Sequence, residues 1–403
     1  SAFGSALPSL SPAPANTAPA NTAPAPDTPT GGGEGEGGGA VLAASLPPKT
    51  ISLPEPPGDS ISSLSFSAAE PAMLAAASWD GTVRAWSVPN GGRPKHVLTY
   101  RHAAPALCAC WQGRDAAAAV VSGGGDNTVR RVAMGKTELT EVGTHQAPVS
   151  CIATDDEAMP HMVVTGSWDK TVAVWDLRTS RRAHEIVLPD KVLCLSLRHP
   201  HCMIGTATPR EAMLFDMRQL GTAQMQGPSA APLASAFTKL ALRSVCLLPK
   251  GLYEQGFGFV AGTNDGRVGV SFLPPAPASA AAAGSKAAKW GTDFTFKCHR
   301  QGPPPQQQTY PVHALAFSPR RPELLATCGG DGEVCLWDVK RREKQGQIVG
   351  APSVRCAVRA MAFSPSGERL AYSHADDWSK GEAGYEALCA SGFANEVRVV
   401  SLD

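Results

Sequence analysis

A nine-residue segment that recurs along the chain limits its possible folds more than any other feature of the sequence. Four copies stand out: SWDGTVRAW (78–86), GGDNTVRRV (124–132), SWDKTVAVW (167–175) and GGDGEVCLW (329–337). In each copy an Asp precedes the last apolar residue by six positions. From Asp80 to Asp126 is 46 residues, and from Asp126 to Asp169 is 43. An internal period of this length indicates a fold made of one small unit repeated many times.

Each copy has the pattern of two β-strands joined by a tight turn. Asp followed by Gly, Asn or Lys favours the turn, because its carboxylate can accept backbone N–H groups, and the β-branched and aromatic residues that follow favour a strand. Units of roughly 40–45 residues built in this way are typical of WD40 propeller blades. The sequence therefore predicts an all-β fold, a seven-bladed WD40 β-propeller. Its turns are predicted near residues 80, 126, 169, 210, 265, 331 and 394.

The regions outside the repeats complete this domain prediction. Residues 50–53 are predicted to supply the outer strand of the seventh blade, which would close the ring and protect its sheet edges. Residues 1–46 are mainly Pro, Ala, Gly, Thr and Ser, and we expect a disordered tail, with a partner-binding tail as the alternative. The propeller is predicted over 50–403. Loops are predicted at about 274–289 and at 301–308, with a helix in the alanine run of the first as the alternative.

Other residues recur in step with the turn aspartates. His102 and His145 each stand 24 residues before a turn Asp, and Thr165 stands four before Asp169. This arrangement resembles the hydrogen-bond network of His, Ser/Thr, Asp and Trp that supports WD40 blades. In the second copy Val132 stands where Trp175 ends the third. The predicted network residues are His102, Asp126, His145, Thr165, Asp169 and Trp175.

Several classes of protein find no support in the sequence. The eleven Cys residues include no CxxC pair, which is typical of buried thiols in an intracellular protein, and no signal peptide or membrane span is predicted. The Gly-Lys-Thr at 135–137 follows Arg130 where a phosphate loop needs Gly. His199, His201 and Cys202 lack a distant fourth ligand and are interpreted as a turn. We therefore predict no enzyme, no cofactor, no metal and no small-molecule substrate.

Four segments resemble one WD40 family in particular. They are DSISSLSFS (59–67), GSWDKTVAVWDLR (166–178), DFTFKCHR (293–300) and DDWSKGEAGY (376–385). In content, order and spacing they resemble the messenger-RNA export factors of the nuclear pore, called Rae-one in animals and Gle-two in yeast. The resemblance covers about residues 50–402. The mitotic checkpoint propellers of the Bub-three type share FKCHR and SWD but differ around DWSKG, so the export factors are preferred.

The resemblance implies a non-catalytic function in messenger-RNA export. The expected partners are an FG nucleoporin, bound through a GLEBS-type motif, and single-stranded RNA or mRNP, with checkpoint kinases or spindle components as further partners. The expected locations are the nucleus and the nuclear pore complex of the nuclear envelope, with shuttling to the cytoplasm. The alternatives are a checkpoint adaptor of the Bub-three type and a substrate receptor of a ubiquitin ligase.

The resemblance also assigns candidate binding residues. Basic side chains would pair with phosphates and aromatic ones would stack on bases. For Trp337 the alternative is packing within its own blade, and for Arg342 and Lys344 it is a solvated turn. The predicted RNA or partner groove contains Arg267, Phe296, Lys297, Trp337, Asp338, Arg342 and Lys344.

A second candidate is a polar loop that interrupts the seventh blade. Asp377, Trp378 and Lys380 are predicted to form a partner-binding loop, because loops that expose an aromatic side chain often bind partners. The alternative is that Trp378 only caps the edge of the blade. The residues at 297–300, Lys-Cys-His-Arg, are interpreted as a charged cluster at the surface.

Overall fold

The computed structural model contains one compact unit, Pro47–Asp403, and describes most of its residues. The described residues are 49–68, 72–114, 118–207, 212–219, 241–252, 257–273, 293–349 and 356–402. The predicted tail (1–46), the predicted turn near 210 and the predicted insertion (274–289) lie outside these residues.

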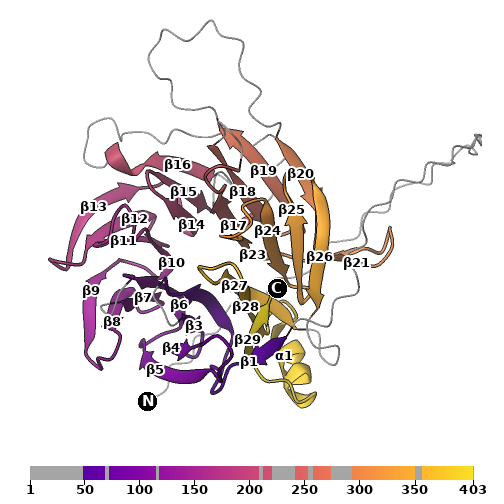
Figure 1. Ribbon diagram of the computed structural model, residues 1–403, viewed down its shortest axis with the longest axis horizontal. Helices are drawn as coiled ribbons and strands as arrows, with labels where there is room; N and C mark the ends of the chain where they lie inside the picture. The colour runs from indigo at the N-terminus through magenta and orange to yellow at the C-terminus, as the bar shows by residue number, and fades with distance from the viewer. Residues whose placement is uncertain are drawn as a thin grey trace, which may run out of the picture. The chain divides into compact units, whose positions relative to one another are not determined.

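Strands dominate the described residues and form seven blade sheets (Figure 1). The first three blades contain β2 (Ile61–Phe66), β3 (Met73–Ser78), β4 (Thr82–Ser87) and β5 (Lys95–Arg101); β6 (Ala106–Gln112), β7 (Ala119–Gly124), β8 (Thr128–Ala133) and β9 (Leu139–Thr144); and β10 (Val149–Thr154), β11 (Met162–Ser167), β12 (Thr171–Asp176) and β13 (Arg181–Val187). Blade 4 contains β14 (Val192–Arg198), β15 (His201–Thr206) and β16 (Ala212–Asp216), followed by the 3₁₀ helix η1 (Met217–Gln219).

The remaining blades follow the same antiparallel order. They contain β17 (Leu242–Leu247), β18 (Phe257–Thr263), β19 (Arg267–Leu273) and β20 (Phe294–Lys297); β23 (Val312–Phe317), β24 (Leu324–Gly329), β25 (Glu333–Asp338) and β26 (Glu343–Val349); and β27 (Ala357–Phe363), β28 (Arg369–Ala375), β29 (Glu396–Ser401) and β1 (Thr50–Ser52). A small hairpin of β21 (Arg300–Gln301) and β22 (Gln308–Thr309) connects blades 5 and 6 and contains the predicted loop at 301–308.

The inner strands of the blades form a closed ring. Each of β2, β6, β10, β14, β17, β23 and β27 contacts the next, and β27 contacts β2 (Figure 1). The seven-bladed prediction is therefore confirmed. The predicted closing strand is confirmed as well, since β1 pairs with β29 through Thr50 opposite Val400 and Ser52 opposite Arg398.

Neighbouring blades pack closely because glycines of the second strands leave room for the next blade. A Cβ atom at Gly166 would lie 2.5 Å from Cγ1 of Val192, which opens the inner strand of blade 4. The same Cβ would lie 2.7 Å from Sγ of Cys151. Val192 is fully buried, so each blade buries the first apolar side chain of the next one.

The antiparallel order gives the ring two faces. The turns between second and third strands, which contain Asp80, Asp126, Asp169, Asp265 and Asp331, define what we call the Asp-turn face. In blade 7 this turn holds a helix, α1 (Gly381–Ala390), where the sequence predicts only a polar loop. The Glu, Ala and Leu residues of α1 have high helix propensity, although none of its side chains is buried.

Candidate functional site

Buried hydrogen-bond networks connect the turn aspartates to the blade cores. In blade 3, Nδ1 of His145 lies 2.9 Å from Oδ2 of Asp169, and Nε2 lies 2.8 Å from Oγ1 of Thr165. The indole N–H of Trp175 donates to the same Thr165 oxygen at 2.8 Å. Burial lowers the pKa of His145, so the imidazole is held in its neutral form. These side chains satisfy one another and are not free to bind a ligand.

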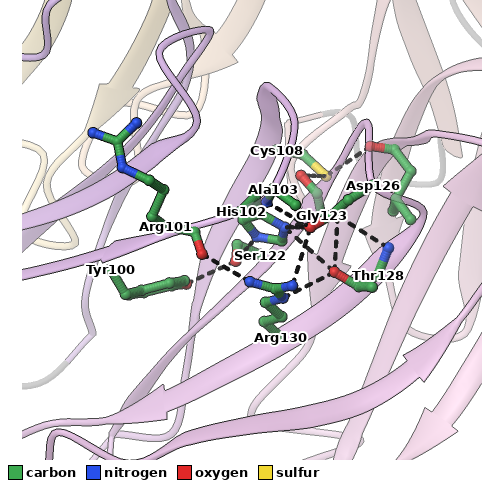
Figure 2. A network of polar contacts seen from close by, with 11 residues as sticks. Tyr100, Arg101, His102, Ala103, Cys108, Ser122, Gly123, Asp126, Thr128 and Arg130 are labelled. Carbon is green, nitrogen blue, oxygen red and sulfur yellow. Dashed lines mark hydrogen bonds and ion pairs between the residues drawn. The ribbon is translucent and has the colours of Figure 1, made fainter.

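Blade 2 builds this network without a tryptophan (Figure 2). His102 contacts Asp126 at 2.9 Å and Ser122 at 2.8 Å. The hydroxyl of Tyr100, on the outer strand of blade 1, donates to Oγ of Ser122 at 2.7 Å and takes the place of the missing indole N–H. Although Ser, His and Asp are connected as in a hydrolase, Ser122 is fully buried, so no substrate can reach its hydroxyl.

The phenol of Tyr100 gives a direct test of this substitution. We expect Tyr100→Phe to lower the free energy of unfolding by about 1 kcal/mol, because it removes one buried hydrogen bond and little volume. The matched control is Tyr310→Phe, whose hydroxyl bonds Gln308 at an exposed site, and it should change the value by less than about 0.5 kcal/mol. Urea unfolding followed by circular dichroism measures both; equal effects would contradict the role given to Tyr100.

A third network lies in blade 6, where the spacing of the repeat had identified no histidine. His299 contacts Asp331 at 2.9 Å and Thr327 at 2.9 Å, and the indole of Trp337 donates to Thr327 at 3.1 Å. His299 stands 32 residues before Asp331 instead of 24, and the β21–β22 hairpin accommodates the eight additional residues. Cys298 and His299 are both buried, so their interpretation as surface residues was wrong.

An aromatic–basic cluster lies at the junction of blades 5 and 6. We use this name for Phe294, Phe296, Trp337, Arg342 and Lys344. The ring centroids of Phe294 and Phe296 are 6.4 Å apart, and those of Phe296 and Trp337 are 4.6 Å apart. Cζ of Arg342 lies 4.2 Å from the centroid of the Phe294 ring, and Nζ of Lys344 lies 6.0 Å from that of Trp337. The cluster presents both cations and π faces, although Trp337 also serves the network of its blade.

The other predicted groove residues are placed differently. Arg267 and Lys297 pair across β19 and β20 at the end near the Asp-turn face, where Nε of Arg267 lies 2.9 Å from Oδ2 of Asp265. Asp338 is buried, and its carboxylate accepts the backbone N–H of Arg341 at 2.8 Å. The structure thus brings four of the seven groove residues into one cluster, while Asp338 stabilises the turn beside it.

The central channel opens on the Asp-turn face with an uneven distribution of charge. Its cavity of about 510 Å³ is lined by Trp79, Trp168 and Leu193 from blades 1, 3 and 4 and by Arg243, His313 and Arg359 from blades 5, 6 and 7. Trp79 and Trp168 are 39% and 38% exposed, although indoles are usually well buried. We call this surface the channel mouth. It consists of Trp79, Trp168, Leu193, Arg243, His313 and Arg359.

Two guanidinium groups at the channel mouth have no carboxylate partner. Within the described part of the chain, neither the Arg243 nor the Arg359 guanidinium makes a hydrogen bond or an ion pair. Cζ of Arg359 lies 5.9 Å from the centroid of the Trp79 ring. Burial, and then the charge of Arg243, lower the pKa of Arg359. Such a surface favours a ligand with carboxylates and apolar side chains.

The predicted partner-binding loop lies beside the channel mouth, between β28 and α1. Trp378 is 42% exposed and stacks on Tyr385 with centroids 4.8 Å apart. Lys380 is exposed just before α1. Asp377 is not free, because its Oδ2 lies 3.4 Å from Nε2 of His313 and its Oδ1 accepts the N–H of Ser379 at 3.0 Å.

Two further properties follow from the described residues. No three His, Cys, Asp or Glu side chains among them are grouped so that they could hold a metal ion. None of the helices found in these parts of the chain is long and apolar enough to cross a membrane.

The chain is similar to a WD-repeat family model and to several WD-repeat proteins of known name. Residues 49–87, 136–176 and 294–338 match the WD domain, G-beta repeat family. The mRNA export factor of Xenopus tropicalis is 30% identical over 369 residues, which cover 88% of this chain and 92% of that protein. Protein Rae1 of Drosophila melanogaster is 29% identical over 331 residues (81% and 87%). Mitotic checkpoint protein BUB3.1 of Arabidopsis thaliana is 29% identical over 339 residues (83% and 89%).

Proposed function

Because the chain belongs to the WD40 family of mRNA export factors, we propose that it serves mRNA export as a non-catalytic docking platform. In this proposal it binds a GLEBS-type segment of an FG nucleoporin and contributes to binding single-stranded RNA. Its place of action is the nucleus and the nuclear pore complex, from which it shuttles to the cytoplasm. Checkpoint kinases or spindle components are further partners.

The channel mouth is the observation that carries the proposal. Arg243 and Arg359 offer two fork-shaped donors without a carboxylate of their own, and exposed indoles line the same opening. An extended peptide with carboxylates and apolar side chains satisfies both features at once. Trp378, beside the mouth, would extend the contact area of such a peptide.

The aromatic–basic cluster supports RNA binding as the second half of the proposal. Arg342 lies over the face of Phe294, so a cation and aromatic faces occur together in this cluster. Exposed Lys344 adds a second cation beside Trp337. Single-stranded nucleic acid is bound elsewhere by this same combination of cations and aromatic faces, largely independently of base sequence.

A mitotic checkpoint adaptor is the second candidate. The 29% identity with the Arabidopsis checkpoint protein favours it, since it nearly equals the identity with the export factors. A checkpoint adaptor should prefer a peptide from a checkpoint kinase over a nucleoporin peptide, so direct competition between the two peptides distinguishes the candidates.

The first experiment measures calorimetric binding of a GLEBS-type nucleoporin peptide to the purified chain, and then single-stranded RNA binding to the complex. We expect Arg342→Ala with Lys344→Ala to weaken RNA binding roughly tenfold or more and to lower the slope of log affinity against log salt by about 1.4, since each single-strand phosphate contact contributes about 0.7.

The control variant for the RNA experiment removes two cations elsewhere. Arg93→Ala with Lys136→Ala changes the net charge equally at exposed positions outside the cluster and should leave RNA affinity within about twofold. Absence of peptide binding would overturn the export proposal. If both double variants lose RNA affinity equally, the cluster contributes to RNA binding only through its net charge.

A further inference from the structure

One internal carboxylate lies close enough to the channel mouth to compete with a ligand. We propose that His313 is a positioning residue that holds Asp377 away from Arg243 and Arg359, and so keeps both guanidinium groups available for a carboxylate of the bound peptide. This inference rests on the proposed function, because it concerns how the same peptide site is kept open.

The position of His313 follows from the repeat. Arg243 and His313 each follow the first residue of an inner strand, and Arg359 follows the second, Val358; all three stand where the pairing with the second strand shifts register. The inner strands β17, β23 and β27 contact one another in that order. His313 therefore lies on the strand between the two arginines, and all three side chains line one cavity.

The contact between His313 and Asp377 is enclosed. Their side chains are 4% and 9% exposed, with Nε2 of His313 lying 3.4 Å from Oδ2 of Asp377. A Cβ atom at Gly330 would lie 3.0 Å from the same Asp377 oxygen, so the absence of a side chain there makes room for the carboxylate. Burial opposes its ionisation, but hydrogen bonds, first from His313 and then from Ser379, hold the pKa of Asp377 well below its usual range.

The surrounding loop is fixed at a second point. Oγ of Ser60, in blade 1, donates to the backbone carbonyl of Asp376 at 2.5 Å. The negative charges of Asp377, Asp376 and Asp59 favour the charged form of Arg359, so these are the carboxylates within electrostatic reach of it. Of these three, Asp377 is the one whose side chain is held by a residue of the channel mouth itself.

Removal of the imidazole should release this carboxylate toward the cations. In His313→Ala the ionised Asp377 stays within electrostatic reach of Arg359, whose guanidinium has no ion pair within the described residues. A guanidinium that is paired internally must lose that partner before it binds a peptide carboxylate. We therefore expect His313→Ala to weaken binding of a GLEBS-type nucleoporin peptide roughly tenfold to a hundredfold, the equivalent of one charge-assisted hydrogen bond.

The decisive variant combines His313→Ala with Asp377→Asn. If the released carboxylate causes the loss, the double variant recovers most of the affinity, and His313→Gln, which keeps an N–H donor, loses little. If the double variant binds as weakly as His313→Ala, the histidine acts only through the shape of the site and the proposal is overturned. His96→Ala is the matched control, because it removes a histidine 3.6 Å from the Glu55 carboxylate, outside the channel mouth, and should not change peptide affinity.

A second measurement needs no peptide and separates this inference from the proposed function. Phenylglyoxal labels guanidinium groups, and peptide mass spectrometry reads its extent at Arg243 and Arg359. Labelling should fall at least severalfold in His313→Ala and return in the double variant, even if no nucleoporin peptide binds the wild-type chain. Unchanged labelling in His313→Ala would overturn the inference, whatever the peptide experiment shows.

Discussion

Asp331→Ala should lower the free energy of unfolding by about 3 kcal/mol or more, because it removes one partner from a buried, hydrogen-bonded network. The Asp331 side chain is 1% exposed, and its carboxylate lies 2.9 Å from Nδ1 of His299, which is itself buried against Thr327. After the substitution this imidazole nitrogen has no partner and no access to water. Urea unfolding of the full chain, followed by far-ultraviolet circular dichroism, measures the change.

Asp80→Ala is the matched control for this prediction. Asp80 occupies the equivalent turn of blade 1, but it accepts bonds from Thr82 and Gly58 and has no histidine partner. It should therefore cost about 1 kcal/mol, the usual price of a lost turn-capping group. If both variants lose the same stability, the bond between Asp331 and His299 contributes nothing beyond the turn itself, which would contradict the prediction.

Gly143→Ala is expected to have the second large effect, a loss of about 2–3 kcal/mol. Gly143 lies on the outer strand of blade 2, and a Cβ atom there would overlap the six-membered ring of Trp175 in blade 3. The indole cannot retreat without lengthening its 2.8 Å hydrogen bond to Thr165. Thermal unfolding of the variant, with near-ultraviolet circular dichroism to follow the indoles, measures the loss.

Gly346→Ala provides the comparison. Gly346 also lies within an outer strand, β26, but a Cβ atom there would meet no other atom within 4 Å. Alanine restricts the unfolded chain more than glycine does, so stability should stay the same or rise by up to about 1 kcal/mol. A destabilisation equal to that of Gly143→Ala would mean that any side chain in these strands is harmful, irrespective of the indole.

The repeated local chemistry explains how much of the fold could be predicted from the sequence. An Asp-containing turn followed by β-branched residues specifies two strands of a blade wherever it occurs, so the positions of the turns predicted the ring. The closing strand at residues 50–53 followed from the need to pair β29. The sequence did not predict helix α1, because the polar residues of DWSKG favour a loop. The residues with high helix propensity are those that follow this segment.

Contacts between blades were harder to predict than those within them. His299 escaped the pattern because eight inserted residues changed its spacing to Asp331. Tyr100 lies in the neighbouring blade, 22 residues before Ser122, and its hydroxyl takes the place of the indole N–H that blade 2 lacks. The spacing within a repeat does not reveal a replacement from another blade.

The sequence contains a signal for the two arginines and the histidine of the channel mouth. Leu242-Arg243, Val312-His313 and Val358-Arg359 all place a basic residue directly after an apolar residue at or next to the start of an inner strand. The register shift after the apolar residue determines which side chain lines the cavity. The position of such a shift cannot be predicted from the sequence.

The pairing of β1 with β29 has a consequence for the synthesis of the chain. Of all the described strands, β1 leaves the ribosome first and β29 last, so β1 remains without its pairing partner throughout the production of the other blades. During this interval each nascent chain exposes β1 as a free strand. Ring closure then competes with strand exchange between chains translated side by side on one messenger, so slower elongation or crowded translation should increase the yield of interlocked dimers at the expense of monomers.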